Sequence, residues 1–292
     1  MSGNNIDKPS RDFEIMHQNN NSDDLYKSET RDSALERVRT AGTISMSPEL
    51  FERLYLGPQT KVSGDLRKTF GNPTPLGLIG FVVGLTPLAC CLMGWRGAGG
   101  LGTANIGVYF FIGGPLLMFS GILEFFLGNT FPFLVFVTYG GIFLALGGTL
   151  QSFYGSATIY SPTLNFYEGL QSPGFNASLA FFPLVAALLN VYFMVAATRI
   201  NAVFTYVFAG SAMGFILFAS FLWALAEGST EASGRLLVGT GGAWFATVLG
   251  GWYLLAVQML GVAGFSLALP VGDFSAFWER RKNKKTEREH SA

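Results

Sequence analysis

A central block of 197 residues that is almost free of charge constrains the fold of this chain more than any other feature. Residues 74–270 hold seven Asp, Glu, Lys and Arg side chains, whereas residues 1–73 hold 21 and residues 271–292 hold ten. Soluble domains average about 25% charged residues. Helices built from this block would be apolar on every side, which is typical of a bundle inside a bilayer. The block therefore excludes a soluble enzyme and a nucleic-acid-binding domain.

The charge pattern predicts four parts along the chain. Residues 1–45 are polar and lack apolar periodicity, which is typical of a disordered tail. Residues 46–73 predict an amphipathic juxtamembrane segment, residues 74–270 a membrane domain, and residues 271–292 a basic tail. No apolar signal region opens the chain, so we expect insertion to begin at the first internal apolar helix.

The membrane domain is predicted to be all-α, a polytopic bundle of six transmembrane helices. Each apolar segment has roughly the 20 residues that a spanning helix needs. The turn Gly128-Asn129-Thr130 is so short that the second and third helices must form an antiparallel hairpin. The last apolar run continues to Leu269, so the sixth helix is either long or bent near Gly264. The predicted helices are 75–95, 105–127, 131–153, 178–198, 202–226 and 238–262.

Basic residues near the helix ends predict the orientation in the membrane. Six spans leave both termini on one side, and Lys and Arg gather in both flanks, which places both tails in the cytoplasm. The longest loop, 155–177, has no Lys or Arg and is predicted outside, although Arg96 and Arg235 fall on that side too. We expect a multi-pass plasma-membrane protein. The acceptor pattern at Asn176 lies outside but abuts a helix, which would hinder glycosylation.

Few residues in the membrane block could carry chemistry. The only two cysteines, Cys90 and Cys91, are neighbours that point in different directions and predict free thiols. Both histidines, His17 and His290, lie in the tails, so we expect no metal site in the membrane. No Gly-rich phosphate loop and no nucleophile–base set occurs. The sequence therefore predicts neither an enzyme nor a cofactor.

The first helix is predicted to open with a polar mouth. Pro73 and Pro75 should keep Asn72 and Thr74 extended. The Asn72 amide would then sit beside backbone N–H groups that lack intrahelical partners. Such a helix start favours a carboxylate, which predicts an anion-binding substrate entry at Asn72 and Thr74. The alternative is that Asn72 only caps the helix.

Glu124 is the only acidic residue inside a predicted span. A charge at that depth is costly and marks a functional candidate. One interpretation is a group that takes up and releases a proton along a pore. The other is structural, because Glu124 lies about one turn before Gly128-Asn129-Thr130 and could accept hydrogen bonds from that turn.

Small residues form stripes on two of the predicted helices. Gly77, Gly80 and Gly84 share one face of the first helix, and Gly210 and Gly214 share one face of the fifth. Such stripes let helix backbones approach closely in lipid. They predict packing seams, and a small-residue face could also line a narrow passage.

Several motifs resemble those of a known family, the acetate uptake transporters of the YaaH/SatP type. They occur in order over residues 70–275, and Ser47-Pro48-Glu49-Leu50-Phe51 resembles the family's fungal branch. The matching stretches are Asn72-Pro73-Thr74-Pro75-Leu76-Gly77-Leu78-Ile79-Gly80-Phe81, Leu123-Glu124-Phe125, Gly128-Asn129-Thr130-Phe131, Tyr139-Gly140-Gly141, Arg199-Ile200-Asn201, Gly250-Gly251-Trp252-Tyr253 and Leu269-Pro270-Val271-Gly272-Asp273.

This resemblance implies a six-helix, channel-like carrier for acetate and other short monocarboxylates, with uptake coupled to protons. It implies a homo-hexamer in membrane lipid with one pore in each protomer. Phe81 and Tyr139 match two of the hydrophobic positions at which the family's pore narrows. No nucleic-acid partner is implied.

The chain departs from the family pattern at two places. The third constriction position is an apolar residue of the fifth helix, but the region here reads Gly210-Ser211-Ala212, so no residue is assigned. Gly113-Gly114 is followed by Pro115 and Leu117 instead of the family's glutamine. Some relatives are tied to ammonia export. An ammonia or ammonium exporter and a transport-deficient membrane sensor therefore stand as alternatives.

Overall fold

The computed structural model describes residues 70–265, 269–272 and 274, and the regular structure in this part of the chain is helical. Six of the described helices are long and apolar enough to cross a membrane, which confirms the predicted all-α, six-span architecture. The predicted tail 1–45, the juxtamembrane segment as far as residue 69 and the basic tail from residue 275 lie outside the described residues. The six spans are Thr74–Leu92, Gly100–Phe126, Thr130–Leu150, Pro173–Ala197, Ala202–Ala226 and Thr230–Val262.

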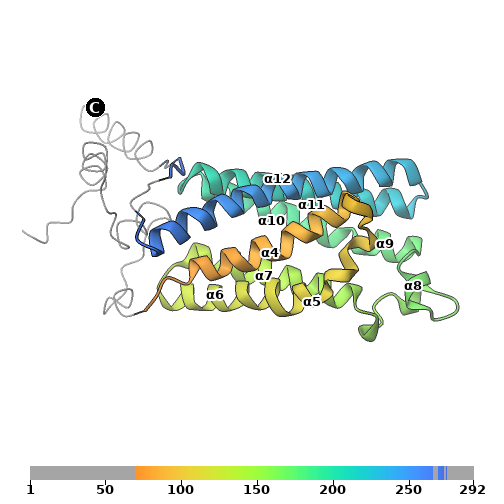
Figure 1. Ribbon diagram of the computed structural model, residues 1–292. Helices are drawn as coiled ribbons and strands as arrows, with labels where there is room; N and C mark the ends of the chain where they lie inside the picture. The colour runs from red at the N-terminus through yellow and green to blue at the C-terminus, as the bar shows by residue number, and fades with distance from the viewer. Residues whose placement is uncertain (1–69, 266–268, 273, 275–292) are drawn as a thin grey trace, which may run out of the picture.

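The helices form two layers that run along a common direction (Figure 1). One layer holds the first three spans and the other the last three; α4 packs against α6 and α12 and so joins the layers. The start of α4 and the end of α12 lie at one end of the bundle, and α8 and α9 lie at the opposite end. The α-helices are α4 (Thr74–Leu92), α5 (Ile106–Val108), α6 (Gly114–Phe126), α7 (Thr130–Leu150), α8 (Phe166–Gly169), α9 (Pro173–Leu179), α10 (Phe181–Ala197), α11 (Ala202–Ala226) and α12 (Thr230–Val262).

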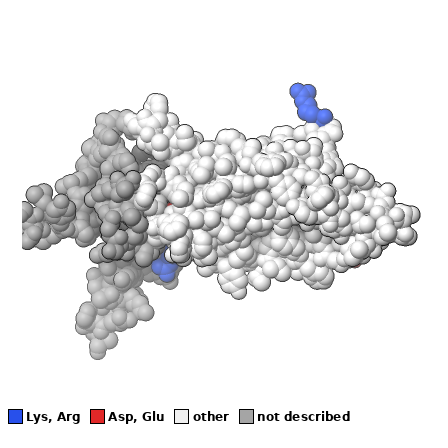
Figure 2. Space-filling model, turned by 90° about the horizontal axis from the view of Figure 1, so that it is seen from below, with Lys and Arg blue, Asp and Glu red and all other residues white. Residues whose placement is uncertain are grey.

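Large apolar side chains cover the outside of the bundle. Phe119 on α6 is 63% exposed and Val185 on α10 is 64% exposed. The face shown in Figure 2 carries almost no charged side chains. Apolar patches of this extent belong against lipid or against another subunit. The chain is therefore a multi-pass membrane protein.

The turn between α6 and α7 has the geometry that the sequence predicts. Gly128 adopts a left-handed conformation with φ of 76°, which glycine reaches without strain. The Gly128 N–H donates to the Phe125 carbonyl, and the Asn129 N–H donates to the Glu124 carbonyl. This pair of bonds is the Schellman motif, which satisfies the last carbonyls of α6. Gly128-Asn129-Thr130 therefore reverses the chain within three residues.

The sixth helix begins earlier than predicted. Its predicted start is residue 238, whereas α12 begins at Thr230. The first two turns of α12 carry Glu231 and Arg235, so a prediction that follows the apolar residues leaves these turns out of the helix. These two side chains pair at 3.5 Å with the i,i+4 spacing that supports a helix at its exposed end. The helix ends at Val262, and Gly264 follows with a φ of 77°.

The fourth span also begins earlier than predicted, and this places the acceptor asparagine inside it. Pro173 opens α9 at the first helical position, where its missing N–H does no harm. Asn176 is 2% exposed, and its amide donates to the carbonyls of Leu170 and Ser172. Asn176 is therefore inaccessible for glycosylation in the folded protein.

The segment between α7 and α9 is shaped by a small polar cluster. Ser161 and Thr163 both donate hydrogen bonds to the Glu168 carboxylate at 2.5 Å. These bonds hold the pKa of Glu168 below its usual value. Asn165 caps α8 by accepting from the N–H groups of Tyr167 and Glu168.

The glycine stripes are packing seams, as predicted. A Cβ atom at Gly84 would lie 2.7 Å from the Phe143 ring of α7, and one at Gly77 would lie 2.7 Å from Ser120 Oγ of α6. A Cβ atom at Gly214 would lie 2.2 Å from Trp244 Nε1 of α12. Side chains at these positions would force the helices apart.

Candidate functional site

Phe81 and Tyr139 meet in the interior of the bundle. Phe81 lies on α4 and Tyr139 on α7, and their ring centroids are 5.7 Å apart with the planes perpendicular. Both are buried, at 7% and 6% exposure, so neither ring points toward lipid. Phe81 also rests on α12, because a Cβ atom at Gly251 would lie 2.8 Å from its ring. The pair thus fills the space between three helices.

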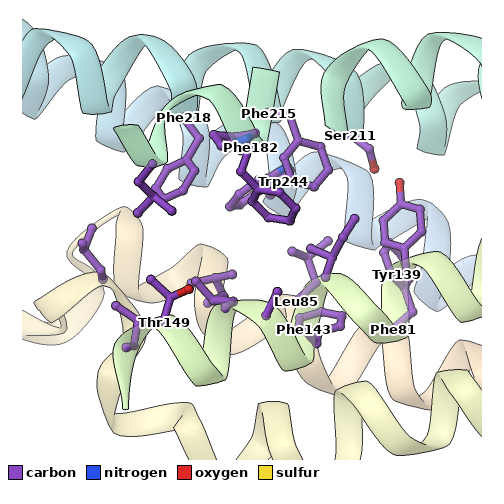
Figure 3. Close-up of a pocket in the computed structure, with 18 residues that line it drawn as sticks. Phe81, Leu85, Tyr139, Phe143, Thr149, Phe182, Ser211, Phe215, Phe218 and Trp244 are labelled. Carbon is purple, nitrogen blue, oxygen red and sulfur yellow. The ribbon is translucent and has the colours of Figure 1, made fainter. Parts of the chain in front are cut away.

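Two cavities meet at this aromatic pair. The larger, which we call the outer cavity, has a volume of about 250 Å³ and is also lined by Leu150 of α7 and Leu179 of α9. Figure 3 shows Phe81 and Tyr139 at one end of this cavity and Thr149 toward the other. The smaller, the inner cavity, has a volume of about 30 Å³ and extends toward Leu78 and Leu254. Phe81 and Tyr139 line both. The two rings therefore separate two hollow regions that lie along the bundle.

The lining of the two cavities is apolar. It includes no Asp, Glu, Lys, Arg, His or Cys among the described residues, and Tyr139 is its only titratable side chain. The polar groups of the outer cavity are the hydroxyls of Tyr139, Thr149 and Ser211 and the indole of Trp244. An anion in this space would find no opposite charge, which makes its transfer from water costly.

The Tyr139 hydroxyl is fixed by a neighbouring amide. Tyr139 donates its proton to Asn190 Oδ1 of α10. Asn190 is 1% exposed and donates in turn to the Ala186 carbonyl at 2.8 Å. This chain orients the phenol at the end of the outer cavity. Ser211 of α11 lies beside it, and the two hydroxyl oxygens point toward each other (Figure 3).

Glu124 lies in a second polar site, at the end of the bundle where α4 begins. Its carboxylate is fully buried and accepts hydrogen bonds from the Thr74 hydroxyl and the Asn129 side-chain amide. Ser120 of α6 donates to the Pro73 carbonyl at 2.8 Å nearby. These contacts join the start of α4 to the α6–α7 hairpin. Glu124 lines neither cavity.

Asn72 caps the first helix. Its Oδ1 atom accepts the Thr74 N–H at 3.0 Å, and its amide nitrogen lies 3.5 Å from Gln258 Oε1 of α12. The N–H groups of Leu76 and Gly77 both donate to the Pro73 carbonyl. The prolines have no N–H, so the free backbone donors expected beside Asn72 are absent from the described helix start.

Thr74 differs from its predicted conformation. It is the first residue of α4 and is not extended. Pro75 sits in the first turn of α4, where a backbone N–H would have no intrahelical acceptor. Its missing N–H therefore costs nothing there, and the helix can start before it, at Thr74. The Thr74 hydroxyl is buried and is directed at Glu124.

Two residues of the interior were missed at the sequence level. The sequence does mark Asn190 as a candidate, because an amide side chain within an apolar span needs a hydrogen-bond partner. The sequence gives little indication of a role for Ser211, because a serine between Gly210 and Ala212 is as typical of a helix-packing seam as of a functional site. No group of three metal-ligating side chains occurs among the described residues.

Comparison with known proteins places these features in a family. The sequence model described as the GPR1/FUN34/yaaH family matches residues 57–271. Protein alcS of Aspergillus fumigatus is 42% identical over 254 residues, which cover 87% of this chain and 93% of alcS. The acetate transporter protein patA of Aspergillus clavatus is 30% identical over 215 residues, covering 73% of this chain and 83% of patA.

Two further relatives bear on fold and on the alternatives. Ammonia transport outward protein 2 of Saccharomyces cerevisiae is 27% identical over 242 residues, which cover 77% of this chain and 82% of that protein. The structure of the bacterial acetate channel SatP superposes with a TM-score of 0.55 and 23% identity, covering 70% of this chain and 99% of SatP. The likeness to SatP supports the fold.

Proposed function

This chain belongs to the GPR1/FUN34/yaaH family, and we propose that it transports acetate and related short-chain monocarboxylic acids across the membrane. The observation that carries this proposal is the Phe81–Tyr139 pair, which separates two apolar cavities inside one protomer. Both residues match the family's constriction motif, and patA is named as an acetate transporter. The pair is proposed as the pore constriction.

The apolar lining favours the undissociated acid as the species that crosses the constriction. A carboxylic acid with a pKa of about 4–5 is mostly an anion at neutral pH. The lining of both cavities offers the anion no opposite charge. A proton that travels with the anion removes this cost, so we propose that uptake is proton-coupled.

Glu124 has two proposed roles, and its surroundings favour the structural one. Its carboxylate accepts from Thr74 and Asn129 and lies outside both cavities, as expected for a group that holds the hairpin against α4. A proton donor to the substrate would need to reach the pathway. The Glu124→Gln variant, treated in the Discussion, separates the two roles.

The membrane setting follows the charge pattern of the chain. We propose a plasma-membrane location with both termini in the cytoplasm. Lys and Arg gather in the sequence before the first span and after the last, and the start of α4 and the end of α12 lie at the same end of the bundle. The exposed apolar faces of α6 and α10 offer contact surfaces for lipid and for further copies of the chain. A homo-hexamer with one pathway per protomer is the proposed assembly.

Uptake of radiolabelled acetate by intact cells, with and without this protein and between about pH 5 and pH 7, tests the proposed function. Transport predicts protein-dependent uptake that rises as the pH falls. Ammonia export, suggested by the yeast relative, predicts protein-dependent release of ammonia without acetate uptake. A membrane sensor predicts neither flux, although the protein reaches the membrane.

Asn72 is a proposed contact for the substrate at the end of the bundle where α4 begins. The test must distinguish the capping role of its side-chain oxygen from substrate binding by its amide nitrogen. Asn72→Asp keeps the oxygen that accepts the Thr74 N–H but replaces the amide by a negative charge. We expect this variant to accumulate normally and to take up acetate severalfold more slowly at low concentration. Asn72→Ser, which also retains a capping oxygen, is the neutral control. Equal uptake by all three proteins would leave Asn72 with a capping role alone.

A further inference from the structure

A glycine-rich segment joins the end of α4 to the start of α5, at the end of the bundle where α8 and α9 lie (Figure 1). We call residues 94–102 the glycine loop, because five of these nine residues are glycine. Leu101, near the end of the loop, lines the outer cavity. The other residues that line this cavity lie on α-helices. The outer cavity is therefore bounded in part by a connecting segment.

Leu101 holds a backbone conformation that leucine rarely adopts. Its φ is 53° and its ψ is 24°, in the left-handed region that glycine reaches freely and bulky residues reach only at a cost. Gly100 and Gly102 on either side also have positive φ. A glycine at residue 101 would fit this turn without strain. Because a costly conformation persists only where the surroundings impose it, the leucine side chain itself has a use at this position.

Leu101 lies at the end of the outer cavity away from the aromatic pair. Phe81, Leu85 and Leu88 line the cavity one after another along α4. The glycine loop comes next, since a Cβ atom at Gly102 would lie 3.0 Å from Leu88 Cδ1. Phe81 and Leu101 therefore bound the cavity at opposite ends.

The Leu101 side chain bridges the two layers of the bundle. It is partly buried and packs against the main core and also against a smaller cluster formed by Ala180, Phe221 and Leu222. The smaller cluster belongs to the layer of the last three spans, whereas Leu101 belongs to the layer of the first three. Apolar contacts across the layers thus hold Leu101 over the end of the cavity.

The glycine loop is fixed at both ends and open between them. The Trp95 ring lies 4.8 Å from the Phe245 ring of α12, centroid to centroid. The fully buried Tyr109 donates its hydroxyl proton to the Gly102 carbonyl at 3.2 Å. Between these contacts, a Cβ atom at Gly97 or Gly99 would meet nothing within 4 Å. Such backbone can absorb large φ and ψ changes without moving the helices.

We infer that Leu101 is an outer gate, a second closure in series with the Phe81–Tyr139 pair. Packed between the layers, its side chain closes the outer cavity at the end where α8 and α9 lie. A turn of the glycine loop withdraws the side chain and opens that end to water. This inference rests on the proposed function in taking the cavity as part of a transport pathway.

Labelling of a single cysteine in the outer cavity tests the gate without requiring transport. Cys90→Ala and Cys91→Ser remove both native thiols, and Leu146→Cys then places one thiol in the cavity. This parent protein, full-length and in lipid nanodiscs, is treated with a charged thiol reagent that cannot lipid, and its mass is followed with time. We expect slow labelling of the parent. Leu101→Ala should label about tenfold faster, because the contacts that hold the closed state are lost.

Three further variants separate the gate from a general loosening of the fold. Leu101→Gly also removes the side chain but relieves the left-handed backbone, so it should fold well and label as fast as Leu101→Ala. Leu101→Met keeps an apolar chain of similar volume and should label slowly. Leu164 is the matched control, because it has a φ of 56°, is 69% exposed and lines neither cavity. Leu164→Ala should label at the parent rate.

Fast labelling of the parent, or equal rates in the parent and in folded Leu101→Gly, would overturn the gate. A rate in Leu164→Ala that rises as much as in Leu101→Ala would also overturn it. Labelling that depends on Leu101, in a protein that gives cells no acetate uptake, would refute the proposed function and leave the closure standing. Acetate uptake together with labelling that is indifferent to Leu101 would refute the gate alone.

Discussion

Replacing Glu124 by Ala is expected to remove most of the folded protein from the membrane. The change leaves the Thr74 hydroxyl and the Asn129 amide without the acceptor that they share. The Thr74 hydroxyl is fully buried, and a buried donor left unpaired costs about 1–3 kcal/mol, whereas a whole domain is stable by only about 5–15 kcal/mol. The contact between the start of α4 and the α6–α7 hairpin should loosen. Immunoblots of membrane fractions and the thermal unfolding midpoint of the extracted protein measure the loss.

Glu124→Gln is the control that decides whether this residue also handles protons. Glutamine keeps one carbonyl acceptor in the same volume but cannot titrate. We expect it to accumulate at a level between those of the native protein and Glu124→Ala, and to retain the native pH dependence of acetate uptake. A folded Glu124→Gln protein whose uptake no longer responds to pH would instead establish the proton role. Normal abundance of Glu124→Ala would show that the buried carboxylate does not hold the hairpin.

The helices were predictable because lipid imposes one strong requirement. A span needs about 20 apolar residues with every backbone group bonded within it, so hydropathy finds the interior of each helix. The requirement ends at the water interface. Polar turns such as the one with Glu231 and Arg235 continue a helix past its apolar part, and an apolar pattern cannot locate their start.

The site was predictable only in part, because the packing of the helices decides which side chains of different helices contact each other. The motifs drew attention to Phe81, Tyr139 and Glu124, but they do not state which residue each one touches. That Tyr139 bonds Asn190 follows from the approach of α7 to α10. Likewise, the sequence leaves both capping and anion binding open at Asn72. The choice depends on whether nearby N–H groups are free, and those of Leu76 and Gly77 donate to the Pro73 carbonyl.

Replacing Phe81 by Ala is expected to open the constriction. Removing the ring would join the outer and inner cavities, which Phe81 now helps to separate. Uptake of acetate should rise by about tenfold, equivalent to about 1.4 kcal/mol off the barrier. Bulkier acids such as succinate should also enter faster than they enter through the native protein. Initial uptake rates of each labelled solute in matched cells, normalised to protein abundance, measure both effects.

Phe143→Ala is the matched control, because Phe143 is a buried aromatic residue of α7 that lines only the outer cavity. It should lose stability like Phe81→Ala without connecting the cavities. Gly251→Ala should act in the opposite direction, since the new methyl group would press on the Phe81 ring from 2.8 Å and hinder its movement. Slower uptake in Gly251→Ala together with faster, less selective uptake in Phe81→Ala would show that the Phe81 ring forms the barrier to the passage of the solute. If both Phe variants merely lose uptake in proportion to abundance, the barrier lies elsewhere.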